Sequence, residues 1–124
     1  MRLLLDTHAA IWWLSDDRRL GAGAQAQMGD DSNAVLLSGA VVWEVAIKRS
    51  LGKLDTPEGF APRLLEAGAI ALAVSVEHAA AVERLPQHHR DPFDRLLVSQ
   101  ALIERATIVS DEAAIRDYDV PVLW

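Results

Sequence analysis

Three consecutive leucines, Leu3 to Leu5, run directly into Asp6, and a segment with helical spacing of apolar residues follows at once. A short apolar run that ends at a helix-capping residue is typical of a buried strand that leads into a turn. In parallel α/β sheets, ligands bind just beyond the carboxyl ends of the strands. We therefore expect Asp6 to lie at a ligand-binding edge of such a sheet.

The alternation of strand and helix continues to the end of the chain. Strands are predicted over residues 3–5, 34–37, 70–76, 107–109 and 120–123. Helices are predicted over residues 9–14, 21–29, 40–51, 58–67, 77–85, 92–105 and 111–118. This order implies parallel pairing and right-handed crossovers. The predicted fold is an α/β, three-layer α/β/α sandwich around a central, mostly parallel five-stranded sheet, with its last strand at an edge because Pro121 cannot donate a ladder hydrogen bond.

Length and composition limit the classes of protein that this chain can represent. Its 124 residues fit one domain, residues 1–124, and the 51% of hydrophobic residues suffice for a core. A chain without cysteine has no disulfide and no thiol chemistry, which fits a reducing cytoplasm. The apolar run before Asp6 is too short for a signal peptide or for the roughly 20 residues of a membrane span. We expect a cytoplasmic protein without a membrane partner.

The net charge of −6, from 12 basic and 18 acidic residues, is typical of a protein without a broad nucleic-acid-binding surface. A nuclease remains possible, because an acidic site that holds a divalent metal ion becomes locally positive. The charge therefore favours recognition at a local patch.

Four acidic residues stand at positions that suit a shared site. Asp6 and Asp111 follow predicted strands, Asp94 opens a long helix, and Glu44 interrupts an apolar helix. If the strands before Asp6 and Asp111 are neighbours, these two carboxylates come side by side. Mg²⁺ and Mn²⁺ prefer carboxylate oxygens, and converging acids repel one another without such an ion. A bound ion would polarise a phosphate and lower the pKa of a water molecule, which is the chemistry of phosphodiester hydrolysis.

Each of these acids also has a purely structural interpretation. Asp91 followed by Pro92 is a good helix start, with Asp94 at the third position facing the helix dipole. Asp6 and Asp111 fit the role of helix caps equally well. The four acids together have a common explanation in a metal site, whereas the structural interpretation needs several separate caps.

Glu44 has its own alternative, which is an ion pair with Lys48 one helical turn later on an exposed stripe. Lys48, Arg49 and Lys53 form a small basic group near Glu44. They could steer a phosphate backbone, although solvated charge is the simpler interpretation.

The chain resembles PIN-domain proteins, and the VapC-type toxins of bacterial toxin–antitoxin pairs in particular. The resemblance covers essentially the whole chain in order, and it is carried by LLLDTHAAIWWL, VVWEVAIKRSLGKL, HHRDPFDRLLVSQAL and ATIVSDEAAIRDYDVPVLW. It implies a metal-dependent endoribonuclease that uses Mg²⁺ or Mn²⁺ and cuts RNA. It also implies a cognate antitoxin as partner, and a homodimer that can enter a larger toxin–antitoxin assembly.

The resemblance assigns roles to the four acids. Asp6, Glu44, Asp94 and Asp111 match the family's acids in that order; the first, third and fourth would hold the metal ion. Glu44 would bind the ion directly or through water, or would help to activate the attacking water. Hydrolysis would leave a 3′-hydroxyl and a 5′-phosphate. Ser110 directly precedes Asp111, where the family more often has one further residue.

Five further side chains near these acids have open roles. Thr7 could steady the site through its hydroxyl or cap a helix. Arg95 could touch a phosphate, pair with a neighbouring acid or lie on a solvated helix face. His88, His89 and Asp91 resemble a transition-metal cluster, but adjacent side chains in a loop rarely complete a site and no further His or Cys supports one. We expect them to contact phosphate or to order the loop.

The tryptophans Trp12, Trp13 and Trp43 could stack on bases. Aromatic residues on apolar helical faces are more often core or interface residues. Trp12 and Trp13 are adjacent, so they cannot both face inward from one helix, and we expect one of them to meet a partner.

Two other functions remain open from the sequence. The first is an aspartyl phosphotransferase with Asp6 as nucleophile, which is weakened because His8 stands where such enzymes have a second acid. The second is a non-catalytic binding or scaffold module whose acids are only helix caps.

Overall fold

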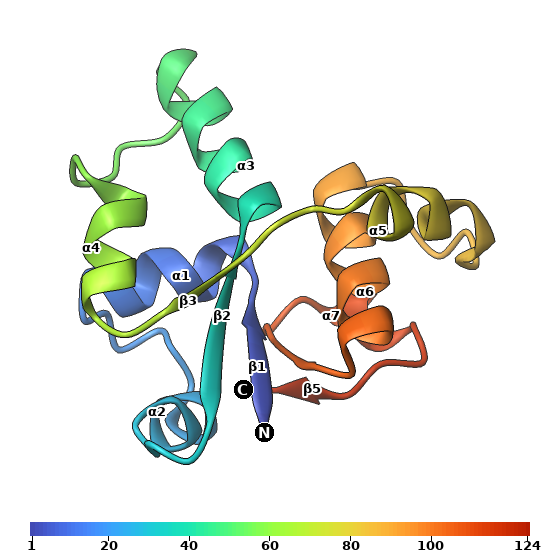
Figure 1. Ribbon diagram of the computed structural model, residues 1–124. Helices are drawn as coiled ribbons and strands as arrows, with labels where there is room; N and C mark the ends of the chain where they lie inside the picture. Colours follow the sequence, from blue (N-terminus) through green and yellow to red (C-terminus); the bar gives the residue numbers. More distant parts are fainter.

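The computed structural model describes residues 1–124 and has a five-stranded sheet at its centre, in the order β3-β2-β1-β4-β5 (Figure 1). The strands are β1 Arg2–Leu5, β2 Ala34–Ser38, β3 Ile70–Leu72, β4 Thr107–Val109 and β5 Val122–Leu123. All four pairings are parallel. β1 is the middle strand, and Leu3 is paired with Val35 on one side and with Thr107 on the other. The prediction of a parallel five-stranded α/β sheet is confirmed.

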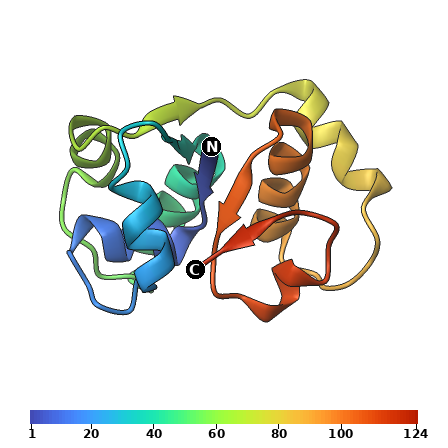
Figure 2. The same cartoon turned by 90° about the horizontal axis from the view of Figure 1, so that it is seen from below.

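Helices cover both faces of this sheet. They are α1 Thr7–Leu14, α2 Ala22–Met28, α3 Gly39–Ser50, α4 Phe60–Glu66, α5 Val76–Ala81, α6 Pro92–Glu104 and α7 Ala113–Arg116, with the short 3-10 helix η1 Val82–Arg84 after α5. From β1 the chain continues through β2 to β3 at one edge of the sheet. It then passes to the other side of β1, where β4 and β5 follow. Right-handed crossovers therefore place the two sets of helices on opposite faces. Figure 2 shows α1, α2 and α4 on one side and α5, α6 and α7 on the other.

The core lies on both faces of the central strands. Leu3, Leu4 and Leu5 of β1 are fully buried, as is Ile108 of β4. Full burial of one such side chain contributes about 1.5–3 kcal/mol relative to its exposure. Because both faces of β1 and β4 are packed, the positions of the residues that follow these strands are well fixed.

The third predicted strand, over residues 70–76, is too long. β3 ends at Leu72, because Ser75 begins the next helix: its hydroxyl accepts a hydrogen bond from the backbone N–H of His78, and the His78 side chain accepts one from the backbone N–H of Ser75. This reciprocal capping box satisfies two free amide groups and fixes the start of α5. The predicted helix over 77–85 accordingly begins one residue earlier, and it ends as η1.

Other boundaries follow from local chemistry that the sequence does carry. Gly52 and Gly68 have φ angles of +69° and +110° just after α3 and α4, which is the left-handed conformation expected of residues that end helices. Pro121 directly precedes β5, the edge strand, as predicted. The final strand is shorter than predicted because Val120 donates to the carbonyl of Tyr118 in a turn.

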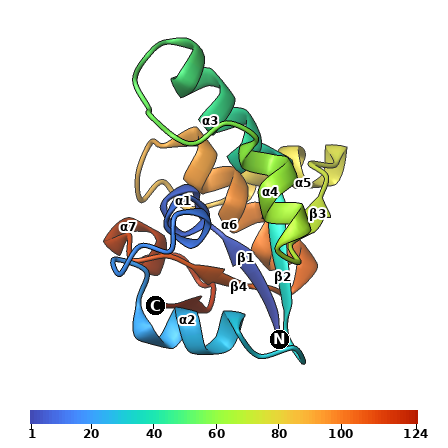
Figure 3. The ribbon, with the colours of Figure 1, turned by 90° about the vertical axis from the view of Figure 1, so that its left-hand side faces the viewer.

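A crevice between two strands follows from this topology. β1 leads into α1 on one face, and its neighbour β4 leads towards α7 on the other face. Such a switch point in a parallel sheet is where ligands bind, beyond the carboxyl ends of the strands. Figure 3 shows α3 extending beyond the sheet above α1, so that α3 forms a further wall at this end. No helix has both the length and the apolar character that are needed to cross a membrane.

Candidate active site

Asp6 lies at the end of β1 and is 2% exposed. Its carboxylate caps α1 by accepting a hydrogen bond of 2.8 Å from the backbone N–H of Ala9, so the predicted capping role is confirmed. Its own N–H donates to the carbonyl of Val109 in β4. Burial raises the pKa of Asp6 to about 6, against the opposing effect of hydrogen bonds from Ser110 and Ala9. The carboxylate is therefore both a helix cap and a buried group whose ionised form is disfavoured.

Asp94 approaches the same place from the first turn of α6. The helix begins as predicted, with Asp91 as N-cap and Pro92 at its first position. The Asp91 carboxylate accepts hydrogen bonds from the N–H groups of Phe93 and Asp94. Burial raises the pKa of Asp94 to about 6, and the charges of Asp91 and Asp6 act in the same direction.

Glu44 reaches the site from the middle of α3. It is buried, and one carboxylate oxygen accepts a hydrogen bond of 2.6 Å from the Thr7 hydroxyl. The other oxygen pairs with the Lys48 ammonium group at 2.5 Å. The predicted pair at one helical turn is confirmed, but its placement on an exposed stripe is wrong, since Glu44 faces inward while Lys48 reaches over it from the solvent side.

These side chains line a cavity of about 80 Å³ that contains no hydrophobic residue. Its walls come from the starts of α1 and α6, from α3 and from the segment after β4. Five of the eight lining residues are acidic, namely Asp6, Glu44, Asp91, Asp94 and Glu112. The other three are Thr7, His8 and Lys48. A polar cavity with five acidic residues at a switch point suits a cation, or a reactant that brings a cation with it.

Asp111 lies outside this cavity. It is exposed, although its charge still raises the pKa of Asp6. The residue that lines the cavity is its neighbour Glu112, whose carboxylate is 3.9 Å from Nδ1 of His8. The alternative role of Asp111 as a helix cap is wrong, because Glu112 occupies the capping position of α7. The sequence pattern did not indicate Glu112 as a site residue, because only its place directly after Asp111 relates it to the other acids.

Arg95 does not face the cavity. It is buried, and its guanidinium group donates to the carbonyls of Pro86 at 2.7 Å and Val82 at 3.3 Å and to the hydroxyl of Tyr118 at 2.9 Å. All three expected roles, which were contact with phosphate, pairing with an acid and a solvated face, are therefore replaced by a structural one. Arg95 fastens the loop before α6 to the core.

The histidines of that loop have a similar role. The rings of His88 and His89 pack edge-on against Tyr118, with centroid distances of 4.8 and 5.4 Å. Nδ1 of His89 lies 2.8 Å from the Tyr118 hydroxyl, and Nε2 lies 3.5 Å from the Asp94 carboxylate. The expectation that these histidines order the loop is confirmed.

The donor set of the cavity fits Mg²⁺ or Mn²⁺. Its ligands are carboxylate oxygens, which hard divalent cations prefer. Burial raises the pKa of Asp6 and of Asp94 to about 6, so a bound cation would favour the ionised form of both carboxyls. As the side chains stand, no three His, Cys, Asp or Glu groups are close enough to share one ion. An ion would therefore be held through side-chain rotation or bridging water molecules.

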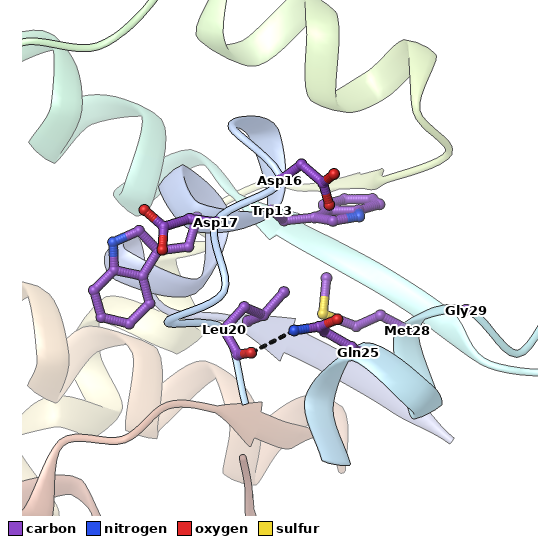
Figure 4. A pocket seen from close by; sticks show the side chains of 8 residues that line it. Trp13, Asp16, Asp17, Leu20, Gln25, Met28 and Gly29 are labelled. Atoms are coloured by element: carbon purple, nitrogen blue, oxygen red, sulfur yellow. Dashed lines mark hydrogen bonds between the residues drawn. The ribbon is translucent and has the colours of Figure 1, made fainter. Parts of the chain in front are cut away.

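The two adjacent tryptophans are both half-buried against the chain's own residues. Trp12 stacks on His8 and lies edge-on to Trp124, while Arg19 sits 5.0 Å above its ring. Trp13 lines a separate cavity of about 200 Å³ between α1 and α2, together with Asp16 (Figure 4). The expectation that one of the two meets a partner stays a prediction.

Trp43 is the exposed tryptophan. Its side chain is 60% exposed and touches Phe93 edge-on at a centroid distance of 5.4 Å. It borders an apolar groove of about 430 Å³ that is formed by α3, α4 and the edge of the sheet near β3. Leu65 and Ile70, on α4 and β3, are also exposed. This face carries more uncovered apolar surface than the cavity side.

The chain belongs to the PIN domain family, since the family model matches residues 3–121. No curated protein sequence matches it. Among solved structures, it is similar to VapBC2 from Rickettsia felis bound to a DNA fragment from the promoter, with a TM-score of 0.72 and 15% identity over 98% of this chain and 97% of that one.

Two further structures share the fold. FitAcB from Neisseria gonorrhoeae has a TM-score of 0.63 and 16% identity, over 97% of this chain and 95% of that one. A toxin–antitoxin complex from Klebsiella pneumoniae has a TM-score of 0.59 and 18% identity, over 89% of this chain and 86% of that one. The predicted PIN-like fold is confirmed.

Proposed function

We propose that this protein is a Mg²⁺- or Mn²⁺-dependent endoribonuclease that acts as the toxin of a toxin–antitoxin pair. The observation that carries the proposal is the small polar cavity that Asp6, Glu44 and Asp94 line together with no hydrophobic residue. Membership of the PIN domain family supports a nuclease. The similarity in fold to a toxin–antitoxin complex from Klebsiella pneumoniae supports a toxin.

In this proposal Asp6 and Asp94 hold the ion, and Asp111 adds negative charge from the rim. Glu44 binds the ion directly or through water. When bound, a divalent ion supplies positive charge that polarises the phosphate and lowers the pKa of a coordinated water molecule. We expect the ion to bind because its positive charge neutralises the negative charges of Asp6 and Asp94.

The residues of the chain perform the remaining tasks. Thr7 holds Glu44 in one orientation, in which this carboxylate would accept a proton from the attacking water. The amino-terminal ends of α1 and α6 both face the cavity, and their dipoles favour a negatively charged phosphate. Attack in line with the leaving group breaks the bond between phosphorus and the 3′-oxygen, which leaves a 3′-hydroxyl and a 5′-phosphate.

We further propose that the cognate antitoxin covers the apolar groove beside Trp43. An exposed apolar groove of this size is typical of a surface that receives the apolar face of a partner helix. We also propose that the chain is a cytoplasmic single domain over residues 1–124 that forms a homodimer. Sedimentation of the chain alone reports the dimer, and a Trp43→Ala variant that still binds antitoxin normally would exclude the groove.

Cleavage of a total RNA pool tests the catalytic proposal. Purified, antitoxin-free protein is incubated with Mg²⁺, with Mn²⁺ or with chelator, beside Asp94→Ala and the control Asp119→Ala, an exposed acid distant in sequence from the cavity residues of α1 and α3. We expect metal-dependent cutting by the wild type and by the control, and at least a 100-fold loss in Asp94→Ala. Equal cutting by all three proteins would exclude this site.

The same assay separates the other two functions. Activity that survives in Asp6→Ala would favour a module in which the acids are only caps, with a contaminating nuclease as the source of cleavage. Covalent labelling of Asp6 by a phosphoryl donor would favour the aspartyl phosphotransferase. The fragment ends identify the RNA target if cleavage occurs.

A further inference from the structure

Lys48 is the only lysine or arginine that lines the acidic cavity. Building on the proposed function, we propose that Lys48 is the resident counter-ion of this cavity and that a divalent ion must displace its ammonium group from Glu44 in order to bind. Lys48 is thus a positioning residue that sets how tightly the metal ion is held.

The geometry of the Glu44 carboxylate carries this inference. Thr7 donates to Oε1, and Lys48 occupies Oε2. Both oxygens are therefore already engaged within the protein. An ion that binds Glu44 through Oε2 takes the place of the ammonium group, because the two cations repel each other at contact distance.

The field around Lys48 comes from more than one acid. The Lys48 ammonium group pairs with Glu44 and lines the same cavity as Asp91 and Asp94. The ammonium group therefore neutralises part of the charge that a metal ion would otherwise see. Removal of Lys48 leaves this charge uncompensated and available to the ion.

The displacement itself is easy for this side chain. The Lys48 side chain is 45% exposed, whereas that of Glu44 is 8% exposed. A lysine has a flexible stem and strongly hydrated charge, so it can leave the carboxylate for solvent without opening the core. Glu44 cannot move in the same way, because Thr7 holds it and it is buried.

Calorimetric titration with Mn²⁺ tests the competition, with no need for RNA. We expect Lys48→Met and Lys48→Gln to bind Mn²⁺ about tenfold more tightly than the wild type, which corresponds to about 1.4 kcal/mol. Lys48→Arg keeps the charge and stays within about threefold of the wild type. The matched control Lys53→Met, with the same change in net charge at an exposed position outside the cavity, stays within about twofold.

The outcomes distinguish this inference from the proposed function. Equal or weaker Mn²⁺ binding by both Lys48→Met and Lys48→Gln overturns the role of Lys48 and leaves the nuclease proposal intact. The same tenfold change in Lys53→Met also overturns it, because the effect is then one of net charge alone. A tenfold gain in Mn²⁺ affinity in the Lys48 variants of a protein that cuts no RNA supports the competition and contradicts the nuclease proposal. Absence of Mn²⁺ binding in every variant overturns both.

Discussion

The hydroxyl of Thr7 donates a hydrogen bond of 2.6 Å to Glu44, and this contact joins the first turn of α1 to the middle of α3 across 37 positions of the sequence. It connects the end of the central strand to a helix that comes from the next strand. Because Asp6 precedes Thr7 directly, the contact also sets the position of Glu44 relative to Asp6.

Loss of this hydroxyl has a predictable effect. Thr7→Val keeps the shape of the side chain but leaves one buried oxygen of Glu44 without its donor, which costs about 1–3 kcal/mol of stability. We expect the cleavage rate to fall roughly tenfold or more, because Glu44 is no longer held. Thr7→Ser should retain most of the stability and most of the cleavage rate. Urea unfolding and RNA cleavage measure the two effects, and a fully active Thr7→Val would contradict the proposed orientation of Glu44.

The charge of Asp6 should destabilise the metal-free protein at neutral pH. In the unfolded chain this carboxyl loses its proton near its ordinary value of 3.8, whereas in the folded protein its pKa is about 6. The unfolded state therefore binds fewer protons between about pH 4 and 6, and stability falls as the pH rises through this window. Above about pH 6, the charged Asp6 carboxylate destabilises the folded protein by its full amount.

Asp6→Asn removes that charge and keeps a good helix cap. We expect it to stabilise the metal-free protein at pH 7.5 by about 1–3 kcal/mol, with a clearly smaller gain at pH 4, while RNA cleavage is lost. Urea unfolding in the presence of chelator measures the difference, and Asp119→Asn is the control. A variant that is less stable than the wild type at pH 7.5 would show that burial does not penalise this carboxylate.

Metal binding should depend steeply on pH. The pKa values of Asp6 and Asp94 are both about 6, so protons compete with the ion for two carboxylates below that pH. We expect Mn²⁺ affinity to fall by about 30-fold between pH 6 and 5 and to change little above pH 7. Calorimetry at pH 5, 6 and 7.5 gives these affinities. The same affinity at pH 5 and 7.5 would mean that other groups hold the ion.

The contributions of Asp94 and Asp111 to metal binding should differ, because only Asp94 lines the cavity. We expect Asp94→Asn to weaken Mn²⁺ binding at least about tenfold more than Asp111→Asn, which acts only through longer-range charge. Glu112→Gln should lie between the two. Calorimetry on the three variants at pH 7.5 tests this order, and an Asp111→Asn effect as large as that of Asp94→Asn would require the segment after β4 to turn its acid into the cavity.

Arg95 should matter for stability. Arg95→Met leaves the carbonyl of Pro86 and the hydroxyl of Tyr118 without their buried donor, so we expect a loss of about 2–4 kcal/mol. Arg95→Lys should recover less than half of this, since one ammonium group cannot span the same acceptors. The exposed control Arg116→Met should change stability by at most about 0.5 kcal/mol. A loss below 1 kcal/mol for Arg95→Met would mean that water satisfies these groups.

Sequence patterns predicted the fold well because each one has a local cause. The leucines before Asp6 form a short apolar run that ends at a capping residue, which favours a buried strand, and Asp91 with Pro92 favours a helix start at α6. The end of β3 was missed because the capping box of Ser75 depends on His78 acting as a hydrogen-bond acceptor. That role is specified by the local geometry of the turn, which the hydrophobic pattern does not contain.

The site was harder to predict than the fold, because its members depend on which way each side chain points. Glu112 and Asp111 are adjacent, and no periodicity distinguishes the one that enters the cavity. Arg95 follows Asp94 on the same helix, so it looked like a neighbour of the site, yet α6 turns it to the opposite side towards Tyr118. These orientations follow from tertiary packing.

The parallel order of the sheet has a consequence for the time at which a newly made chain can become active. β1, which carries Asp6, completes its second set of pairings only with residues 107–109, near the carboxyl end. A ribosome-bound chain without these residues has four of the five cavity acids but lacks β4, whose Val109 carbonyl accepts the N–H of Asp6. The site is therefore assembled only after residues 107–109 have left the ribosome, later than the strands and helices that precede them.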